Sequence, residues 1–435
     1  MYQRLLVSLR NSVSRFDVLI ILGIIWFLGK FIRYVFPPLF ELLQQTFTVS
    51  TTLIGWSFSL FLFAYAMIQF PSGYVCDKFG TKSVISGGIL VSSVGALILI
   101  IDTSFFIYLF LMVILGVGTG VHKTAAVQLL SDTYPAHKGR VLGIFDTFGT
   151  VGGVVAPLAV IIAASIPGTR PGWRILLFGT GIFGLVTMSI FILRIDDGFF
   201  GNIRKVFDQN IRPTYSGTRA TAKATDEQVN SNTGWSSYTQ LFVDCRFSTF
   251  VVASICFAFT YQGIVSFLPL YLTQEAGLTP SRAGALYSIL FMAGFCQVVA
   301  GEFSDKFGTL PVIIGALTLA TASILLLILG TDAGIFVLGV ATLSIGLGAH
   351  SFRPVRGAYL MDTLPADLSA GGLGIVRTLL MGSGAIAPGI VGTVADIFSF
   401  RLAFVILSIS IGVATVLSIL LLLIGPNSVS NSSTL

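Results

Sequence analysis

Basic side chains stand inside long apolar segments of this 435-residue sequence, where a charge is costly unless it serves a purpose. Asp146 is the one acidic residue clearly inside such a segment, and His122 and His350 add two further polar rings. One carboxylate cannot neutralise six cations, so the simplest further partner is an anion that binds and leaves. The six basic residues are Lys30, Arg33, Lys123, Arg353, Arg356 and Arg377.

The spacing of these cations predicts an anion site built from several helices. Lys30 and Arg33 are three residues apart and share one helix face, and Arg353 and Arg356 do the same. A guanidinium can hold a carboxylate, sulfonate or phosphate through two parallel hydrogen bonds, whereas a lysine acts as a point charge. We expect Arg33, Arg353 and Lys123 to be the foremost ligands. The full predicted substrate-binding set is Arg33, Lys30, Lys123, Arg353, Arg356 and His350.

Other roles stay open for some of these residues. Lys30 and Arg33 could extend toward a membrane interface, and Arg356 could be an interface residue on the cytoplasmic side. Asp146 and Arg377 stand 231 residues apart, at equivalent positions of a repeat described below, and could form ion pairs that open and close a gate.

The composition indicates which elements hold these side chains. Hydrophobic residues make up 54% of the chain and charged residues only 10%, against roughly 25% charged residues in an ordinary soluble domain. A soluble multidomain protein would lack the charges to cover its surfaces, and a disordered chain would be far less hydrophobic. The four cysteines lack the spacing of metal ligands or of a disulfide framework. We predict an all-α membrane protein without metal or cofactor.

Twelve apolar segments are long enough to span a bilayer as helices. The stretch between the sixth and seventh is rich in polar residues and is predicted to be a soluble linker. The chain thus divides into an N-terminal six-helix bundle (1–194), a linker (195–246) and a C-terminal six-helix bundle (247–435). The predicted spans lie near 16–38, 51–73, 82–101, 105–131, 140–164, 172–194, 247–272, 281–302, 310–330, 333–361, 370–395 and 400–424.

Lysine and arginine outside the spans predict the orientation. With a cytoplasmic N-terminus, 15 of these residues lie on the inner side and four on the outer side. The positive-inside rule therefore places both termini and the linker in the cytoplasm, with the protein in the cell membrane.

The two halves repeat each other. A glycine–acid–lysine–glycine pattern after the second span recurs 228 residues later, after the eighth. Lys123 and Arg353 are likewise equivalent, 230 residues apart, and should lie at similar depth in opposite halves. Parallel duplication of this kind is typical of transporters that bind substrate between the halves. The matching residues are Gly73, Asp77, Lys78 and Gly80 in the first copy, and Gly301, Asp305, Lys306 and Gly308 in the second.

With these motifs the sequence resembles the major facilitator superfamily, whose signature after helix 2 reads G-x-x-x-D-(R/K)-x-G-(R/K)-(R/K). The first copy keeps Lys82 but has Thr81 at a usually basic position, and the second copy lacks both terminal basic residues. The resemblance covers the chain outside the linker. It implies the fold of that family, two pseudo-symmetric six-helix bundles, with helices 1, 4, 7 and 10 around a central cavity.

The resemblance also implies a gating role for the signature. Asp77 should engage the start of helix 11, near Ser369–Gly371, in the outward-facing state, and Asp305 should do likewise at helix 5. From the residues themselves, we expect Gly73 to allow close helix packing and Gly80 a tight turn. The predicted gating residues are Gly73, Asp77, Lys78, Gly80, Lys82, Gly301, Asp305, Lys306, Gly308, Asp146 and Arg377.

The leading functional hypothesis is a secondary transporter that moves a small organic or inorganic anion by alternating access, coupled to a proton or sodium gradient or working by exchange. The alternatives are a proton-coupled exporter of neutral or cationic compounds and a non-transporting sensor on the same fold. Neither enzymatic activity nor nucleic-acid binding is expected, and the chain is expected to act as a monomer in the bilayer. Two family features are absent: Met112 replaces a common arginine of helix 4, and the segment around Pro157 lacks the antiporter motif of helix 5.

Overall fold

The chain is helical nearly throughout the part described by the computed structural model, which comprises residues 2–101, 104–167, 171–194, 241–364 and 369–424. Twelve stretches are long and apolar enough to cross a membrane, which confirms the predicted spans of this multi-pass membrane protein. The helices are α1 (Tyr2–Phe47), α2 (Thr51–Phe79), α3 (Thr81–Ile98), α4 (Phe105–Gly120), α5 (His122–Thr133), the 3₁₀ turn η1 (Pro135–His137), α6 (Lys138–Ala164), α7 (Gly172–Arg194), α10 (Cys245–Gln274), α11 (Pro280–Met292), the 3₁₀ turn η2 (Ala293–Cys296), α12 (Gln297–Phe307), α13 (Thr309–Leu329), α14 (Ile335–Thr363), α15 (Ser369–Ile397) and α16 (Phe400–Ile424).

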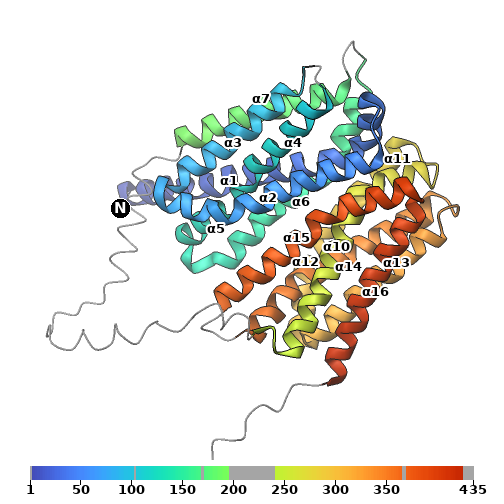
Figure 1. Cartoon of the computed structure of the whole chain (residues 1–435). Coiled ribbons are helices and arrows are strands. Elements are labelled where there is room, and N and C mark those ends of the chain that lie inside the picture. The colour runs from blue at the N-terminus through green and yellow to red at the C-terminus, as the bar shows by residue number, and fades with distance from the viewer. Residues whose placement is uncertain (1, 102–103, 168–170, 195–240, 365–368, 425–435) are drawn as a thin grey trace, which may run out of the picture.

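The helices form two bundles that lie side by side (Figure 1), with α1–α7 in one half and α10–α16 in the other. Contact between the halves runs mainly along two helix pairs, α2 with α15 and α6 with α11. Most of the predicted linker, residues 195–240, lies outside the described residues. Successive spans run in opposite directions, so the start of α1 and the turns after α2 and α12 share one end of the molecule, called here the near end.

Two spans are interrupted, and the first helix continues well beyond its predicted end. The fourth span is divided into α4 and α5 at Val121, and the eighth contains the short segment η2. The first helix does not end near residue 38 but continues through Pro37 and Pro38 to Phe47. Packing explains the extension, because the Phe40 ring lies 5.5 Å from that of Phe58 and 5.4 Å from that of Phe267, between centroids. Neighbouring helices commonly make proline tolerable in a membrane span in this way.

The two signature turns have the same geometry in both halves. Gly80 and Gly308 take φ angles of 83° and 87°, which only glycine adopts readily, so the predicted tight turn is present in each copy. By contrast, a Cβ built at Gly73 would meet none of the described residues within 4 Å, so the expected close packing is absent from this conformation. Asp305 is exposed. The side chains of Asp77 and of residues 369–371, and with them the predicted contact, lie outside the described part.

The far end of the interface is closed by direct contact of α2 with α15. A Cβ at Gly55 would overlap the carbonyl oxygen of Pro388 and approach within 3.2 Å of the Gly392 Cα. The Gly389 backbone N–H donates to the Ser59 hydroxyl at 2.8 Å. Glycine thus lets two helix backbones meet, and hydrogen bonds between the halves fix their register.

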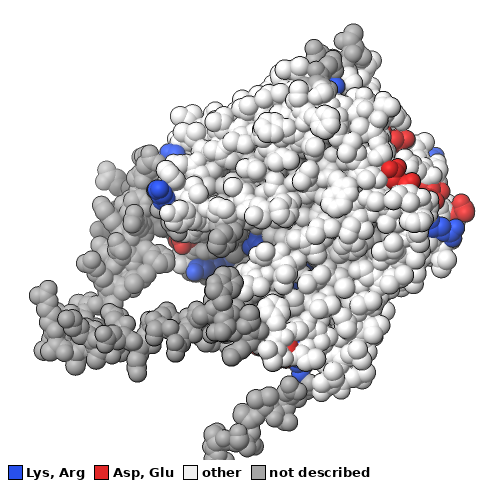
Figure 2. Space-filling view, viewed as in Figure 1, with Lys and Arg blue, Asp and Glu red and all other residues white. Residues whose placement is uncertain are grey.

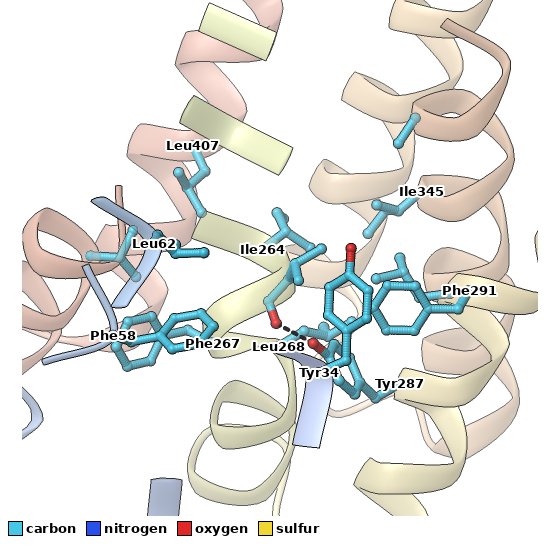
Figure 3. Packing of buried hydrophobic residues seen from close by; sticks show 14 of the residues in the cluster. Tyr34, Phe58, Leu62, Ile264, Phe267, Leu268, Tyr287, Phe291, Ile345 and Leu407 are labelled. Atoms are coloured by element: carbon cyan, nitrogen blue, oxygen red, sulfur yellow. Dashed lines mark hydrogen bonds between the residues drawn. The ribbon is translucent and has the colours of Figure 1, made fainter. Parts of the chain in front are cut away.

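The second pair, α6 with α11, closes the same end: a Cβ built at Gly284 on α11 would lie 3.0 Å from the Ile161 Cδ1 on α6. Tyr34 on α1 also packs against α11. The Tyr34 ring lies 4.3 Å from that of Phe291, between centroids. Figure 3 shows these rings beside Tyr287, whose hydroxyl donates to the Val265 carbonyl at 2.6 Å. The central space between the halves is therefore sealed from the far end.

Candidate substrate-binding cavity

A cavity of about 420 Å³ lies between the halves and is lined by α1, α2, α5, α10, α14 and α15. Figure 2 shows charged side chains gathered mainly toward the two ends of the molecule, while the sides of the bundles are almost uncharged. Five of the six predicted substrate-binding residues line this cavity, and Arg377, predicted as a gate residue, joins them. The basic lining residues are Lys30, Arg33, Lys123, Arg353, Arg356 and Arg377.

Two arginines reach across the interface to a glutamine of the opposite half. Arg33 on α1 donates to the Gln262 Oε1 on α10 at 2.6 Å, and Arg377 on α15 donates to the Gln69 Oε1 on α2 at 2.6 Å. Arg33 therefore does not extend toward a membrane interface. An amide oxygen orients a guanidinium without neutralising it, so both arginines keep their charge for a ligand.

Lys123 forms the one ion pair found in the cavity among the described residues. Its Nζ lies 3.2 Å from the Asp146 Oδ1 on α6. Both residues belong to the N-terminal half, so in this conformation the pair holds α5 to α6 and does not bridge the halves. Asp146 and Arg377, predicted as gate residues, thus have separate partners here.

Aromatic rings carry most of the remaining contacts to the cations. Lys30 and Lys123 lie over the Trp26 ring, 5.0 and 4.9 Å from its centroid. The Arg353 guanidinium lies 5.4 Å from the Tyr261 centroid. Each such contact contributes about 0.5–2 kcal/mol, more where water is excluded. Ring faces stabilise a cation without cancelling its charge, which explains how the cavity holds six cations beside one carboxylate.

A smaller side pocket of about 50 Å³ adjoins the main cavity, and Lys30, Lys123 and Arg353 line both. His350, the sixth predicted ligand, lines only the side pocket. The His350 side chain is 4% exposed, and neither ring nitrogen has a hydrogen-bond partner among the described residues. A buried, unpartnered imidazole costs free energy, and because His350 lines the side pocket, a ligand there could supply the missing hydrogen bond.

Both helix interruptions border these pockets. Lys123 stands two residues after the break at Val121, and η2 leads directly into Gln297, which lines the side pocket. The Gln297 side chain donates to the Gly294 carbonyl at 2.8 Å, which satisfies an acceptor beside the short 3₁₀ segment. Short 3₁₀ segments within helices often mark functional hinges. Hydropathy could not reveal them, because each stretch contains a window apolar enough to be predicted as one continuous span.

Helix α2 contributes residues that the sequence analysis did not single out. Tyr65 and Gln69 line the cavity, and the Tyr65 ring lies 5.1 Å from the Arg33 guanidinium. A glutamine within an apolar span was the available signal for Gln69, whereas nothing marked Tyr65 among 37 phenylalanines and 12 tyrosines. His122 is packed beside Gly88 and lines neither pocket.

Two duplicated six-helix halves around one polar, charged cavity define a membrane transporter of the parallel-repeat type. The sequence model of the Major Facilitator Superfamily matches residues 22–349 and 250–434. The chain belongs to the Major Facilitator Superfamily.

Relatives and solved structures agree with this assignment. The chain is 24% identical over 295 residues to a probable sulfoacetate transporter of Cupriavidus necator, covering 67% of this chain and 65% of that protein, just under two thirds of its length. It is 23% identical to the fosmidomycin resistance protein of Escherichia coli, over 91% of each chain. The crystal structure of a bacterial homologue of the human lysosomal transporter Spinster, inward-facing and occupied, superimposes with a TM-score of 0.73 at 16% identity, covering 94% of this chain and 97% of that one.

Proposed function

We propose that this protein is a secondary transporter that carries a small organic or inorganic anion by alternating access. The observation that carries the proposal is the charge of the cavity, where six cations and a single carboxylate line two adjoining pockets. Charges inside a membrane usually mark a substrate or ion path. A cationic cargo would be repelled by this lining, which disfavours export of cationic compounds.

Several relatives support an anionic cargo. Besides the sulfoacetate protein, they include a hexuronate transporter of Bacillus subtilis at 22% identity, covering 66% of this chain and 63% of that protein. A probable galactarate/D-glucarate transporter of Escherichia coli is 24% identical over 78% of each chain. These named cargoes are anions, and a guanidinium suits their carboxylate or sulfonate groups.

The positive-inside count supports a cytoplasmic near end. With that orientation the sealed far end faces outward, and the conformation is inward-facing. Alternating access would then proceed by opening the α2–α15 and α6–α11 contacts while the near end closes.

A counterflow screen tests the proposed function. Purified full-length protein is reconstituted into liposomes preloaded with one anion, and uptake of the same radiolabelled anion is measured against protein-free liposomes. Carboxylates, sulfonates and phosphates are compared with neutral sugars and with quaternary ammonium compounds. We expect uptake of at least one anion class and none of the cations. Uptake restricted to neutral or cationic compounds would contradict the proposal.

Asp146 pairs with Lys123 and so competes with an anionic cargo for it. Removing the Asp146 charge should therefore strengthen anion binding, whereas removing a cavity cation should weaken it. Asp146→Asn should strengthen anion binding by about twofold to fivefold, because an accessible ion pair of this kind is worth less than about 1 kcal/mol. Isothermal titration calorimetry with the transported anion measures the change. Asp17→Asn is the matched control, since Asp17 pairs with Arg194 at 3.4 Å outside the cavity. Weaker binding in Asp146→Asn alone would show that Asp146 assists the ligand.

A further inference from the structure

The basic residues divide into two groups according to the pocket they line. Lys30, Lys123 and Arg353 border the side pocket as well as the main cavity, and form the first group. The second group borders the main cavity only and consists of Arg33, Arg356 and Arg377. The positive charge of the site therefore has two centres.

Two helices contribute one residue to each group. On α1, Lys30 belongs to the first group and Arg33 to the second, and on α14 the same holds for Arg353 and Arg356. Residues three apart are separated by about 4.5 Å along a helix axis. This rise is comparable to the separation of two charged groups joined by a short carbon chain.

The side pocket has the chemistry of an oxyanion site. Its lining includes Asp146, which is paired with Lys123, so the three cations leave a positive excess beside His350, Thr150 and Gln297. The imidazole has no partner among the described residues, Gln297 keeps a second amide N–H besides the one donated to the Gly294 carbonyl, and the Thr150 hydroxyl, which here donates to the Asp146 carbonyl at 3.3 Å, can rotate toward a ligand. The pocket's volume of about 50 Å³ holds roughly three to five water-sized atoms, at about 10–15 Å³ for each. A carboxylate or sulfonate group has that size.

Gly294 keeps this space available. A Cβ at Gly294 would lie 3.1 Å from the Thr150 Cγ2 and 3.3 Å from the His350 Nδ1. Both neighbours are side chains that line the side pocket. A methyl group here would press the imidazole and the threonine toward the space where an anionic group would lie.

We propose that the substrate is a short dianion, with one anionic group in the side pocket and the other held by the arginines of the main cavity. This inference rests on the proposed anion transport and narrows its substrate class. A monoanion would leave one of the two cation groups without a counter-charge, whereas a dianion with one to three intervening carbons reaches both. His350, Thr150 and Gln297 then determine specificity for the second group.

Titration calorimetry on the purified full-length protein tests the proposal with defined probes. Acetate, propionate and methanesulfonate serve as monoanions, and malonate, succinate and sulfoacetate as dianions. We expect the best dianion to bind at least about tenfold more strongly than any monoanion, because its second anionic group makes additional charge-assisted hydrogen bonds. The titrations are repeated at a second, higher ionic strength, because salt screens long-range attraction more than direct contacts in a buried site. The preference for dianions should therefore persist at the higher ionic strength.

Variants of the side pocket should remove the preference for dianions selectively. Thr150→Val, His350→Gln and Gly294→Ala are each expected to reduce the ratio of dianion to monoanion affinity to below about threefold. Thr147→Val is the matched control, because the Thr147 hydroxyl also donates to the carbonyl four residues earlier on α6 yet lines neither pocket. His122→Gln controls for loss of a buried imidazole. Thr150→Val keeps the shape of the side chain and stays informative if a histidine variant fails to fold.

The outcomes separate the two proposals. Equal affinity for monoanions and dianions, with both weakened by Arg33→Ala, would overturn the dianion proposal and leave anion transport standing. A dianion preference that Thr150→Val, His350→Gln and Gly294→Ala all leave intact would overturn the role of the side pocket. Binding of no anion in the wild-type protein would overturn the proposed function itself.

Discussion

Arg33→Ala and Arg353→Ala are each expected to reduce the initial rate of anion counterflow by about thirtyfold or more. Removing a charged partner of a desolvated ligand costs at least about 2 kcal/mol, and tenfold corresponds to 1.4 kcal/mol. Arg33 is held by Gln262 and Arg353 by the face of Tyr261, so neighbouring cations cannot simply take their places. Uptake into proteoliposomes at equal protein density measures the effect.

Two further kinds of variant test whether the effect belongs to the cavity arginines: lysine replacements at the same positions, and removal of an arginine outside the cavity. Arg33→Lys and Arg353→Lys should recover only part of the rate, because a lysine keeps the charge but loses the two parallel hydrogen bonds. Arg282→Ala serves as the control, since Arg282 is exposed at the start of α11 and lines neither pocket. Unchanged transport of every anion in both alanine variants would show that the cavity arginines do not bind cargo.

Gly55→Ala is expected to reduce transport to below about a tenth of wild type. The new methyl group would overlap the backbone of Pro388, which cannot move aside as a flexible side chain can. Overpacking of this kind typically costs 1–3 kcal/mol. The cost falls only on the closed far end, so the equilibrium should shift toward conformations in which that end is open.

Spin labels report this shift directly. Gln45 and Asp332 are exposed at the far end of opposite halves, and the distance between labels at these sites should lengthen in Gly55→Ala. Gly382→Ala is the matched control, because Gly382 lies on α15 with no described residue within 4 Å of an added Cβ. An unchanged distance distribution would mean that the α2–α15 contact does not set the conformational equilibrium.

The sequence predicted the fold because a bilayer restricts what an apolar chain can form. Long apolar runs had to be helices, and the repeated Gly80 and Gly308 turns exposed the duplication. The cavity cations could also be predicted, because Lys123 or Arg353 within an apolar span requires an explanation. The aromatic partners could not be, since Trp26 and Tyr261 look like ordinary packing residues until the helices are assembled.

The closed far end lay beyond prediction for a different reason. One sequence encodes every conformation of an alternating-access protein, and only packing shows which contacts a given conformation makes. Gly55 and Gly389 differ in no sequence property from Gly382, yet the first two meet the opposite half and the third meets open space. The extension of α1 beyond Pro38 had the same origin, because Phe40 finds its partners on α2 and α10.

The cationic lining also determines how readily the protein can turn over without cargo. Six basic side chains line the open cavity; water that enters it would hydrate them, and closing the near end around an empty site would strip that water away. Each cation left dry at the membrane centre costs roughly 2.5–3.5 kcal/mol. In the proposed anion transport a bound anion would supply compensating charge at that moment, so we expect the loaded protein to reorient faster than the empty one. We therefore expect this lining to suppress cycling of the empty protein and to favour the exchange of one anion for another.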